Sequence, residues 1–224
     1  MATATLERPT TDTGAPRAAS RTRPTKERIT FAEYMERERE SETRHDLVEG
    51  VMEEVSGGTT QHSTICGNVI TQFNIALDDT ECSVMTSDQK VFIREYLVRY
   101  PDVTVACGEL QVAFGEALQN PLLIVEVLSQ STALKDRDNK FREYRTLESL
   151  QHYVLIDQYK PRIEHYERQE NGRWLLAREL DSMEDDWQFT LSETAITIPF
   201  AKIYRRVSFP EIDPTETEEE RRDA

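Results

Sequence analysis

The stretch from Pro121 to Tyr144 constrains the fold more than any other part of the chain. It begins with an apolar run, Leu122–Leu128, which a single charged residue, Glu126, interrupts. An apolar run of this length, bounded by a proline and a serine, is typical of a strand that is buried on both faces. A lone carboxylate in such a strand costs free energy unless it is paired or binds a metal. The stretch therefore predicts a central strand that carries an ion-paired or metal-binding acid.

A helix is expected directly after this strand. Ser131 or Thr132 can cap its N-terminus, because a hydroxyl side chain accepts hydrogen bonds from the first free backbone N–H groups. Asp136, Lys140 and Tyr144 recur at every fourth residue, which places them on one face of the helix. The spacing therefore predicts a helix that follows the strand and carries Lys140 on this face.

A second acid stands at the start of another expected strand. Tyr100–Asp102 precedes the apolar stretch Val103–Cys107. Carboxylates on two strands and a lysine on the following helix are the groups that metal-assisted phosphodiester hydrolysis needs, since a metal activates water and a cation stabilises the transition state. Asp102, Glu126 and Lys140 are therefore the candidate catalytic residues.

Each of these residues also has a structural interpretation. Glu126 could be a structural acid that is buried against Lys140 or Arg137, since buried ion pairs occur without catalysis. An acid after a proline, as at Asp102, is common in plain turns, and Asp136 with Lys140 could form a surface ion pair worth under about 0.5 kcal/mol. The protein would then be a catalytically silent binding or scaffold module. A two-carboxylate glycosidase is a third, weaker possibility, which needs a sugar-sized cleft.

The charge of the chain is strongly acidic but unevenly distributed. The net charge is −15, which argues against a generic nucleic-acid binder. Residues 33–54 hold nine acids and three bases, whereas Lys135–Arg145 holds five bases and three acids. Arg137, Arg142 and Arg145 are the candidates for contacts to backbone phosphates. Any affinity for nucleic acid should be weak and sensitive to salt.

Length and composition predict one domain over residues 29–210, between a disordered tail at 1–28 and a disordered acidic tail at 211–224. No apolar run approaches the roughly 18 residues of a membrane span, and no secretory signal is visible, so a cytoplasmic location is expected. The cysteines Cys66, Cys82 and Cys107 are odd in number and lack metal-type spacing. We expect them to be reduced, buried side chains.

The remaining elements follow from local patterns. The capping box Thr30–Glu33 predicts a helix to about Glu40, and apolar spacing predicts another from His62 to Leu77. Their order with the expected strands suggests a mixed sheet with helices on both faces. Single strands are expected at about 82–86, 89–94, 101–107, His152–Asp157 and Ala195–Pro199. A strand pair should turn near Gly50, and a hairpin should join 161–168 to 173–180 across Asn171-Gly172. Residues 108–120 are expected to form a polar loop with a short helical turn.

Several segments in this order resemble the Uma-two (Uma2) family of putative restriction endonucleases, which have the PD-(D/E)xK nuclease fold. The matching segments are Ile29–Tyr34, His45–Gly50, His62 at its helix start, Tyr100–Val103, Ile124–Ser129, Asp136-Arg137, Lys140-Phe141 and Tyr153–Asp157. The resemblance implies a fold with both helices and strands, which is classed as α/β or, because its sheet is mixed, as α+β. Helices flank a four-stranded mixed core sheet. The expected hairpin near the C-terminus adds to this core.

The resemblance also implies roles for individual residues. It makes Asp102 and Glu126 ligands of a divalent metal, and it places the catalytic lysine at Lys140 because Leu128 stands two residues after Glu126. We expect the metal to be Mg²⁺, or Mn²⁺, with the backbone carbonyl of Val127 as a further ligand. Asp46 stands where the family usually has glutamate, and it is a possible additional ligand.

The expected function is a metal-dependent endonuclease that acts on nucleic acid, with DNA as the expected substrate and a homodimer as a possible assembly. Geometry can separate it from the silent module. Asp102, Glu126 and Lys140 should converge on one open groove in a nuclease. In a silent module, Lys140 should close off Glu126 in the core. His62 alone is expected to pack locally at the start of its helix.

Overall fold

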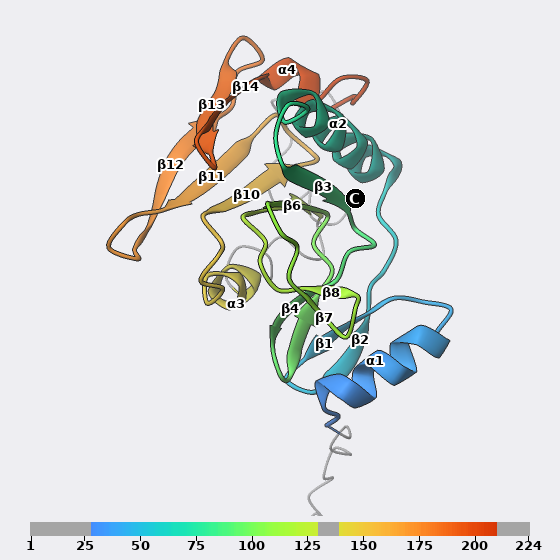
Figure 1. The fold of residues 1–224 in the computed structure, drawn as a ribbon. Helices are drawn as coiled ribbons and strands as arrows, with labels where there is room; N and C mark the ends of the chain where they lie inside the picture. The colour runs from blue at the N-terminus through green and yellow to red at the C-terminus, as the bar shows by residue number, and fades with distance from the viewer. Residues whose placement is uncertain (1–27, 130–138, 210–224) are drawn as a thin grey trace, which may run out of the picture.

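The computed structural model describes residues 28–129 and 139–209, which form two large sheets and a smaller one (Figure 1). The central sheet has six strands in the order β12–β11–β10–β9–β6–β3. These are β3 (Cys82–Thr86), β6 (Val103–Cys107), β9 (Leu123–Leu128), β10 (His152–Asp157), β11 (Ile163–Arg168) and β12 (Trp174–Leu180). The strands β9 and β10 are parallel and their other neighbours are antiparallel, so the sheet is mixed, as expected.

The strand β9 is buried over its whole length, as the apolar run predicts. Its residues alternate between the two faces of the sheet. Leu123, Val125 and Val127 belong to one apolar cluster, and Ile124 and Leu128 belong to another. Each face of the central sheet therefore has its own core.

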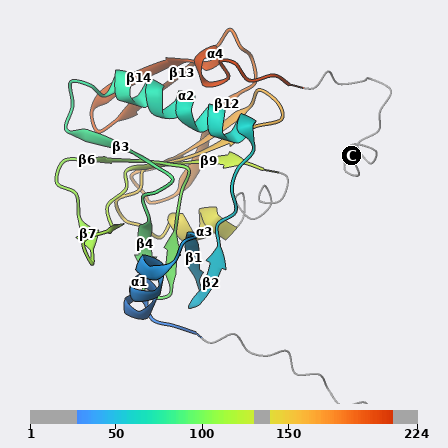
Figure 2. The same ribbon diagram turned by 90° about the vertical axis from the view of Figure 1, so that its right-hand side faces the viewer.

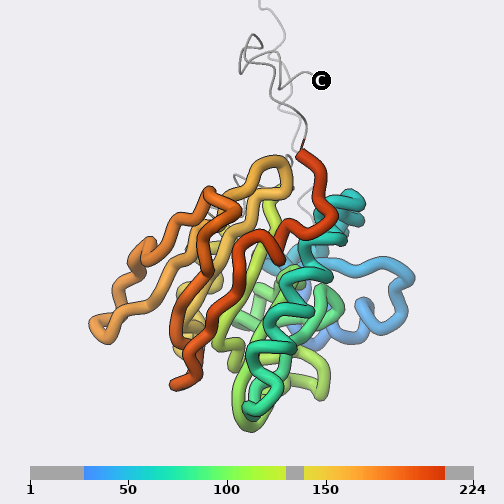
Figure 3. Tube along the Cα trace, turned by 90° about the horizontal axis from the view of Figure 1, so that it is seen from above, coloured from blue at the N-terminus to red at the C-terminus, as the bar shows by residue number. Residues whose placement is uncertain are grey.

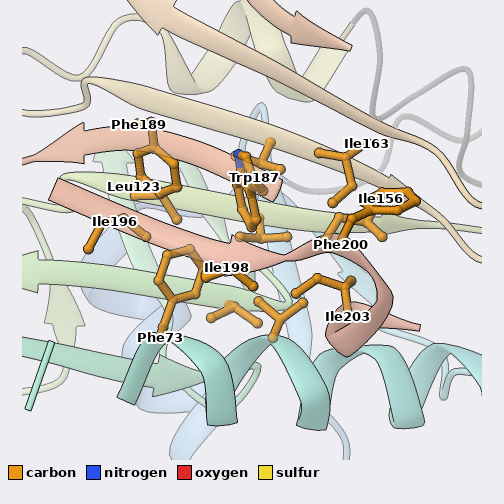
Figure 4. Close-up of a cluster of buried hydrophobic side chains, with 14 of the residues drawn as sticks. Phe73, Leu123, Ile156, Ile163, Trp187, Phe189, Ile196, Ile198, Phe200 and Ile203 are labelled. Carbon is orange, nitrogen blue, oxygen red and sulfur yellow. The ribbon is translucent and has the colours of Figure 1, made fainter. Parts of the chain in front are cut away.

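One face is covered by α2 (Thr60–Ala76), by the two-stranded sheet of β13 (Asp186–Leu191) and β14 (Thr194–Pro199), and by α4 (Phe200–Ile203) (Figure 2). Seen from above, α2 and this C-terminal segment lie side by side (Figure 3). The rings of Phe73, Trp187 and Phe189 meet in the core between them (Figure 4). The late strand β14 is confirmed, whereas its partner β13 was not expected.

The second six-stranded sheet has the order β2–β1–β5–β4–β8–β7. Its strands are β1 (His45–Val48), β2 (Val51–Glu54), β4 (Val91–Arg94), β5 (Leu97–Arg99), β7 (Val112–Ala113) and β8 (Ala117–Leu118). With α3 (Phe141–Tyr144), this sheet covers the other face of the central sheet, through contacts of Val91, Leu118 and Tyr144. Helices therefore lie on both faces of the central sheet, as expected, and on this face the second sheet adds to the cover.

The helix α1 (Phe31–Glu40) packs on the second sheet through Phe31, Tyr34 and Met35. Thr30 and Glu33 form the predicted capping box at its start. The predicted turn between β1 and β2 is a two-residue turn, in which Glu49 and Gly50 have φ angles of 50° and 83°. A Cβ atom at Gly50 would lie 3.1 Å from the Cβ of Arg28, so glycine suits both the conformation and the space.

Two local expectations are wrong. Residues 108–120 contain the short strands β7 and β8 instead of a helical turn. Cys82 and Cys107 lie directly opposite each other in the β3–β6 ladder and form a disulfide, so only Cys66 is free. Sequence spacing could not show this pairing, because it depends on which two strands become neighbours.

Some expectations fall on residues outside the described ranges. They include the helix start at Ser131 or Thr132, Asp136 and Arg137, and the tails apart from Arg28.

The hairpin of β11 and β12 across Asn171-Gly172 is confirmed. None of the helices in the described ranges is long and apolar enough to cross a membrane.

Candidate active site

A cleft of about 540 Å³ lies where the start of β6, the end of β9 and the start of α2 come together. All three candidate catalytic residues, Asp102, Glu126 and Lys140, line it. Val127 and Asp46 line it as well. The folded chain therefore brings together the candidate residues that the sequence places between positions 46 and 140.

Asp102 lies at the point where β6 and β9 separate. The ladder of these two strands runs from the pair Val105–Leu123 to the pair Val103–Val125. Just beyond it, the Asp102 carboxylate accepts a hydrogen bond from the backbone N–H of Val127, at 2.7 Å. The side chain thus takes the place of a backbone partner. This bond holds the carboxylate at the edge of the cleft.

The side chains of Lys140 and Tyr144 both hold Glu126. Its side chain is only 3% exposed, and its Oε2 accepts a hydrogen bond of 2.8 Å from Lys140 Nζ. The hydroxyl of Tyr144 donates to Glu126 Oε1, also at 2.8 Å. Tyr144, which the four-residue spacing places on the helix face of Lys140, therefore contacts the acid directly. Burial, and then the charge of Glu126, raise the pKa of Tyr144, so this hydroxyl keeps its proton and remains a donor.

Lys140 combines features of both interpretations. Its ammonium contacts Glu126, as a silent module would have it, but its side chain is 16% exposed and lines the cleft. Glu126 also lines the cleft, so the ion pair faces an opening and not a closed core. The convergence of Asp102, Glu126 and Lys140 on one open groove is the arrangement that the nuclease interpretation requires.

Asp46 has partners for both of its carboxylate oxygens. Oδ2 accepts a hydrogen bond from Arg99 Nη1, and Oδ1 accepts one from the backbone N–H of Tyr100, each at 2.9 Å. Arg99 also donates to both carboxylate oxygens of Glu143 in α3. This network connects the second sheet to α3, which follows Lys140 directly. In this arrangement, Asp46 orients the side chain of Arg99 and the backbone of Tyr100, which lies two residues before Asp102.

His62 belongs to the site, which the sequence did not predict. Its Nε2 lies 3.2 Å from Asp102 Oδ2, and its Nδ1 lies 3.6 Å from the Sγ of Cys66. Burial, and then the charges of Asp102 and Glu126, raise the pKa of the Cys66 thiol, so that it stays protonated. The four-residue spacing of His62 and Cys66 indicated that they share a helix face. The contact with Asp102 spans 40 residues and had no local signal.

Two of the three candidate phosphate-binding residues are in the described part of the chain, on and just after α3. Arg142 and Arg145 are exposed, and Arg142 donates a hydrogen bond of 2.7 Å to Asn139 Oδ1. Neither arginine is among the described residues that line the cleft. Arg137 lies outside the described residues. Their roles in substrate binding stay predictions.

Comparisons with known proteins agree with this architecture. A model of the Uma2 family, described as putative restriction endonuclease, matches residues 31–197. Two uncharacterized proteins from Synechocystis sp. are similar in sequence. The protein sll1609 is 35% identical over 153 residues, which are 66% of this chain and 85% of the relative. The protein slr1290 is 30% identical over 178 residues, which are 79% of this chain and 92% of the relative.

A solved structure is similar in fold. It is a putative nuclease belonging to DUF820 from Anabaena variabilis, with a TM-score of 0.57 and 15% sequence identity. The match covers 79% of this chain and 97% of that one. At this identity the likeness shows the fold. The expected mixed α+β architecture with a restriction-endonuclease-like core is therefore confirmed, although the central sheet has six strands and not four.

Proposed function

This chain belongs to the Uma2 family of putative restriction endonucleases, and on that premise we propose that it is a metal-dependent endonuclease. It hydrolyses phosphodiester bonds of nucleic acid, with DNA as the expected substrate. The observation that carries the proposal is the convergence of Asp102, Glu126 and Lys140 on one open cleft. Two carboxylates and an ammonium in one cleft are the groups that this chemistry needs.

The residues present fit a divalent cation. Among the described residues, Asp102 Oδ1 has no hydrogen-bond partner, because both of the contacts of this side chain are made by Oδ2. Carboxylate and carbonyl oxygens are the ligands that Mg²⁺ and Mn²⁺ accept. Asp102, Glu126 and the carbonyl of Val127 would hold the ion. When bound, the ion lowers the pKa of a water molecule and neutralises charge on the phosphate.

The protein groups around the ion have separate tasks. Lys140 orients the attacking water and stabilises the negative charge that develops on the phosphate oxygens. The Tyr144 hydroxyl fixes Glu126 through Oε1, so the carboxylate keeps its orientation when Lys140 turns toward a substrate. The backbone N–H of Val127 fixes Asp102 in the same way. Both acids are therefore held before the substrate arrives.

Binding of the polyanionic substrate depends on a few basic residues. Arg142 and Arg145 are exposed on and just after α3, and with Arg137 they would contact backbone phosphates. Glu53 and Glu54 line the cleft and oppose this attraction. With the net charge of −15, they make affinity weak and dependent on low salt.

A silent binding module is the second candidate, because the ammonium of Lys140 already pairs with Glu126. The two candidates differ in what the ion pair does. In a nuclease it is part of an open reaction centre, whereas in a silent module it only neutralises a buried acid.

A cleavage assay tests the proposal directly. Purified protein is incubated with single-stranded, double-stranded and branched DNA and with RNA, in the presence of Mg²⁺, Mn²⁺ or EDTA. We expect cleavage with the metals and none with EDTA. Glu126→Gln keeps the shape of the side chain but removes its charge, so it should abolish cleavage. The matched control Glu36→Gln changes an exposed acid on α1 and should cleave like the unaltered protein.

Two results would contradict the proposal. Cleavage that survives EDTA would rule out the metal mechanism. Retention of full activity by Glu126→Gln would remove this acid from the reaction and favour the silent module.

A further inference from the structure

The backbone at the start of α2 is tied to the end of β9. Thr59 caps the helix, since its Oγ1 accepts a hydrogen bond of 3.1 Å from the backbone N–H of His62. The same hydroxyl donates to Gln158, which in turn donates to the carbonyl of Leu128 at 2.8 Å. The position of His62 is therefore set by the strand that carries Glu126, and not by the helix alone.

The imidazole ring of His62 has little freedom. A Cβ atom at Gly58 would lie 2.6 Å from Nδ1 and 2.8 Å from the ring carbon Cγ, so only glycine leaves room for the ring. On the same nitrogen, Cys66 Sγ lies at 3.6 Å. The other nitrogen, Nε2, is directed at Asp102 Oδ2, 3.2 Å away. The ring is held with one nitrogen at the candidate metal ligand.

The separation of these two atoms suits two ligands of one ion. Ligand atoms that lie about 2.0–2.2 Å from a metal and at right angles to each other are about 3 Å apart. His62 Nε2 is at nearly this separation from Asp102 Oδ2, which also accepts the Val127 N–H and belongs to the same carboxylate as the unpartnered Oδ1. Nδ1 faces the Cys66 sulfur, and a partner on this nitrogen is the common way in which a metal-binding histidine is oriented with its other nitrogen toward the ion.

We propose that His62 Nε2 is a third protein ligand, beside Asp102 and Glu126, and that the cleft therefore takes a first-row transition ion such as Mn²⁺ in preference to Mg²⁺. The inference rests on the proposed function, because the ion is the one that the two acids would hold. Its physical reason is ligand chemistry: imidazole nitrogen binds transition ions well, whereas Mg²⁺ prefers oxygen.

Calorimetric titrations with Mn²⁺ and with Mg²⁺ test the inference without any substrate. In the unaltered protein we expect Mn²⁺ to bind at least about tenfold more tightly than Mg²⁺. In His62→Ala the affinity for Mn²⁺ should fall by roughly tenfold or more, while that for Mg²⁺ should change by less than about threefold. The matched control is His45→Gln. His45 contacts Glu38 outside the cleft, so this substitution should not change the affinity for either ion.

Pulsed electron paramagnetic resonance of the bound Mn²⁺ gives a direct readout. Nitrogen coupling from a ligated imidazole should be present in the unaltered protein and absent in His62→Ala. Gly58→Ala offers a second variant, since its methyl group displaces the ring without removing it. It should weaken both the coupling and the preference for Mn²⁺. Circular dichroism melts establish that each variant is folded.

The outcomes separate this inference from the proposed function. Equal affinities for the two ions, or no nitrogen coupling, would overturn the role of His62 while metal-dependent cleavage by a site of two carboxylates could stand. If neither ion binds and no cleavage occurs, both the inference and the proposed function are wrong. If Mn²⁺ binds through His62 without any cleavage, the inference holds and the enzymatic proposal fails.

Discussion

Two groups of ionisable side chains flank the central sheet, and they differ in their contact with solvent. In the cleft, His62 and Asp102 are partly exposed, with side chains that are 18% and 15% accessible. On the face covered by α2, His165 is fully buried, and its Nε2 lies 3.0 Å from His152 Nδ1. The indole N–H of Trp187 donates to His165 Nδ1, at 3.1 Å. This second group is the buried histidine pair, His152 and His165.

The difference shows that residue type alone does not make a reactive site. In the buried histidine pair, both nitrogens of His165 are already hydrogen-bonded, and aromatic rings surround them. Burial lowers the pKa of His152 to about 4 and that of His165 to about 2, so both stay neutral. In the cleft, by contrast, Asp102 Oδ1 has no partner among the described residues. Solvent access and free lone pairs distinguish the candidate reaction centre from the structural pair.

Acid should destabilise the protein through the buried histidine pair, and this is the largest expected effect. Both histidines are neutral when folded, whereas an unfolded histidine takes up a proton below about pH 6.5. Their contribution to stability is therefore complete above about pH 6.5. It falls at lower pH by roughly 1.4 kcal/mol per pH unit for each histidine, until the pH reaches the folded pKa. Urea unfolding measured from pH 7.5 to 4.5 checks this slope.

A variant sharpens this test. His165→Gln keeps a polar side chain but removes one titrating group, so the slope should fall by about half relative to the unaltered protein. His45→Gln, which lies outside the pair, should leave the slope nearly unchanged. A free energy of unfolding that stays constant between pH 6.5 and 5 would show that the pair does not control acid stability.

Lys140→Met should show the opposite behaviour, with a loss of activity and little loss of stability. Turnover should fall by roughly a hundredfold or more, because one preorganised transition-state donor is lost. Tyr144 still donates to Glu126, and the cleft admits water, so unfolding should change by only about 1 kcal/mol. Metal affinity should stay equal or rise slightly, since a nearby positive charge is removed.

Calorimetric metal titration, thermal melts and single-turnover cleavage of Lys140→Met decide between the two interpretations. If the variant loses about 3–5 kcal/mol of stability, Glu126 has become an unpaired buried charge. That outcome would make the cleft resemble the buried histidine pair, and it would support a silent module.

Trp187→Phe should affect only the core around the buried histidine pair. The change removes the indole N–H that His165 Nδ1 accepts, and it leaves this nitrogen unsatisfied in the core. The expected loss is about 1–3 kcal/mol in the free energy of unfolding, measured in urea. Metal binding and cleavage per folded molecule should not change. A selective loss of activity would show that the buried histidine pair and the cleft are coupled.

Arg142→Gln should have the smallest effect. An exposed arginine that contacts a phosphate contributes affinity by releasing a counterion, so its loss should weaken binding equally for all sequences. The slope of log affinity against log salt should become shallower by about 0.7–0.9. Fluorescence anisotropy with labelled DNA at several salt concentrations measures this. A slope identical to that of the unaltered protein would remove Arg142 from the binding surface.

Much of the fold could be predicted because the signals are local. The apolar run around Glu126 indicated the buried strand β9, and Thr30 with Glu33 indicated the start of α1. The pairs Glu49-Gly50 and Asn171-Gly172 lie in the turns of two β-hairpins, near the expected positions. Each signal depends on a few neighbouring residues whose backbone preferences survive in the folded protein. The short strands β5, β7 and β8 have too few residues for such a pattern and were missed. The strand β13 was also missed, although its residues alternate between polar and apolar.

The candidate site could be predicted in part. Asp102, Glu126 and Lys140 stand out by their positions beside expected strands and by the family resemblance, and the structure places them at one cleft. Their catalytic roles stay predictions. His62 could not be assigned to the cleft from its own surroundings, because a histidine at a helix start most often packs locally.

The sequence by itself indicated most of the segments that become strands and helices, and it indicated that a carboxylate would be buried in the central strand. Only the tertiary structure decided what meets that carboxylate. The contacts of Tyr144 with Glu126 and of His62 with Asp102, and the bond between Cys82 and Cys107, join residues that lie 18 to 40 positions apart. The physical reason is that backbone preferences act over a few residues, whereas strand order and helix packing bring distant side chains together.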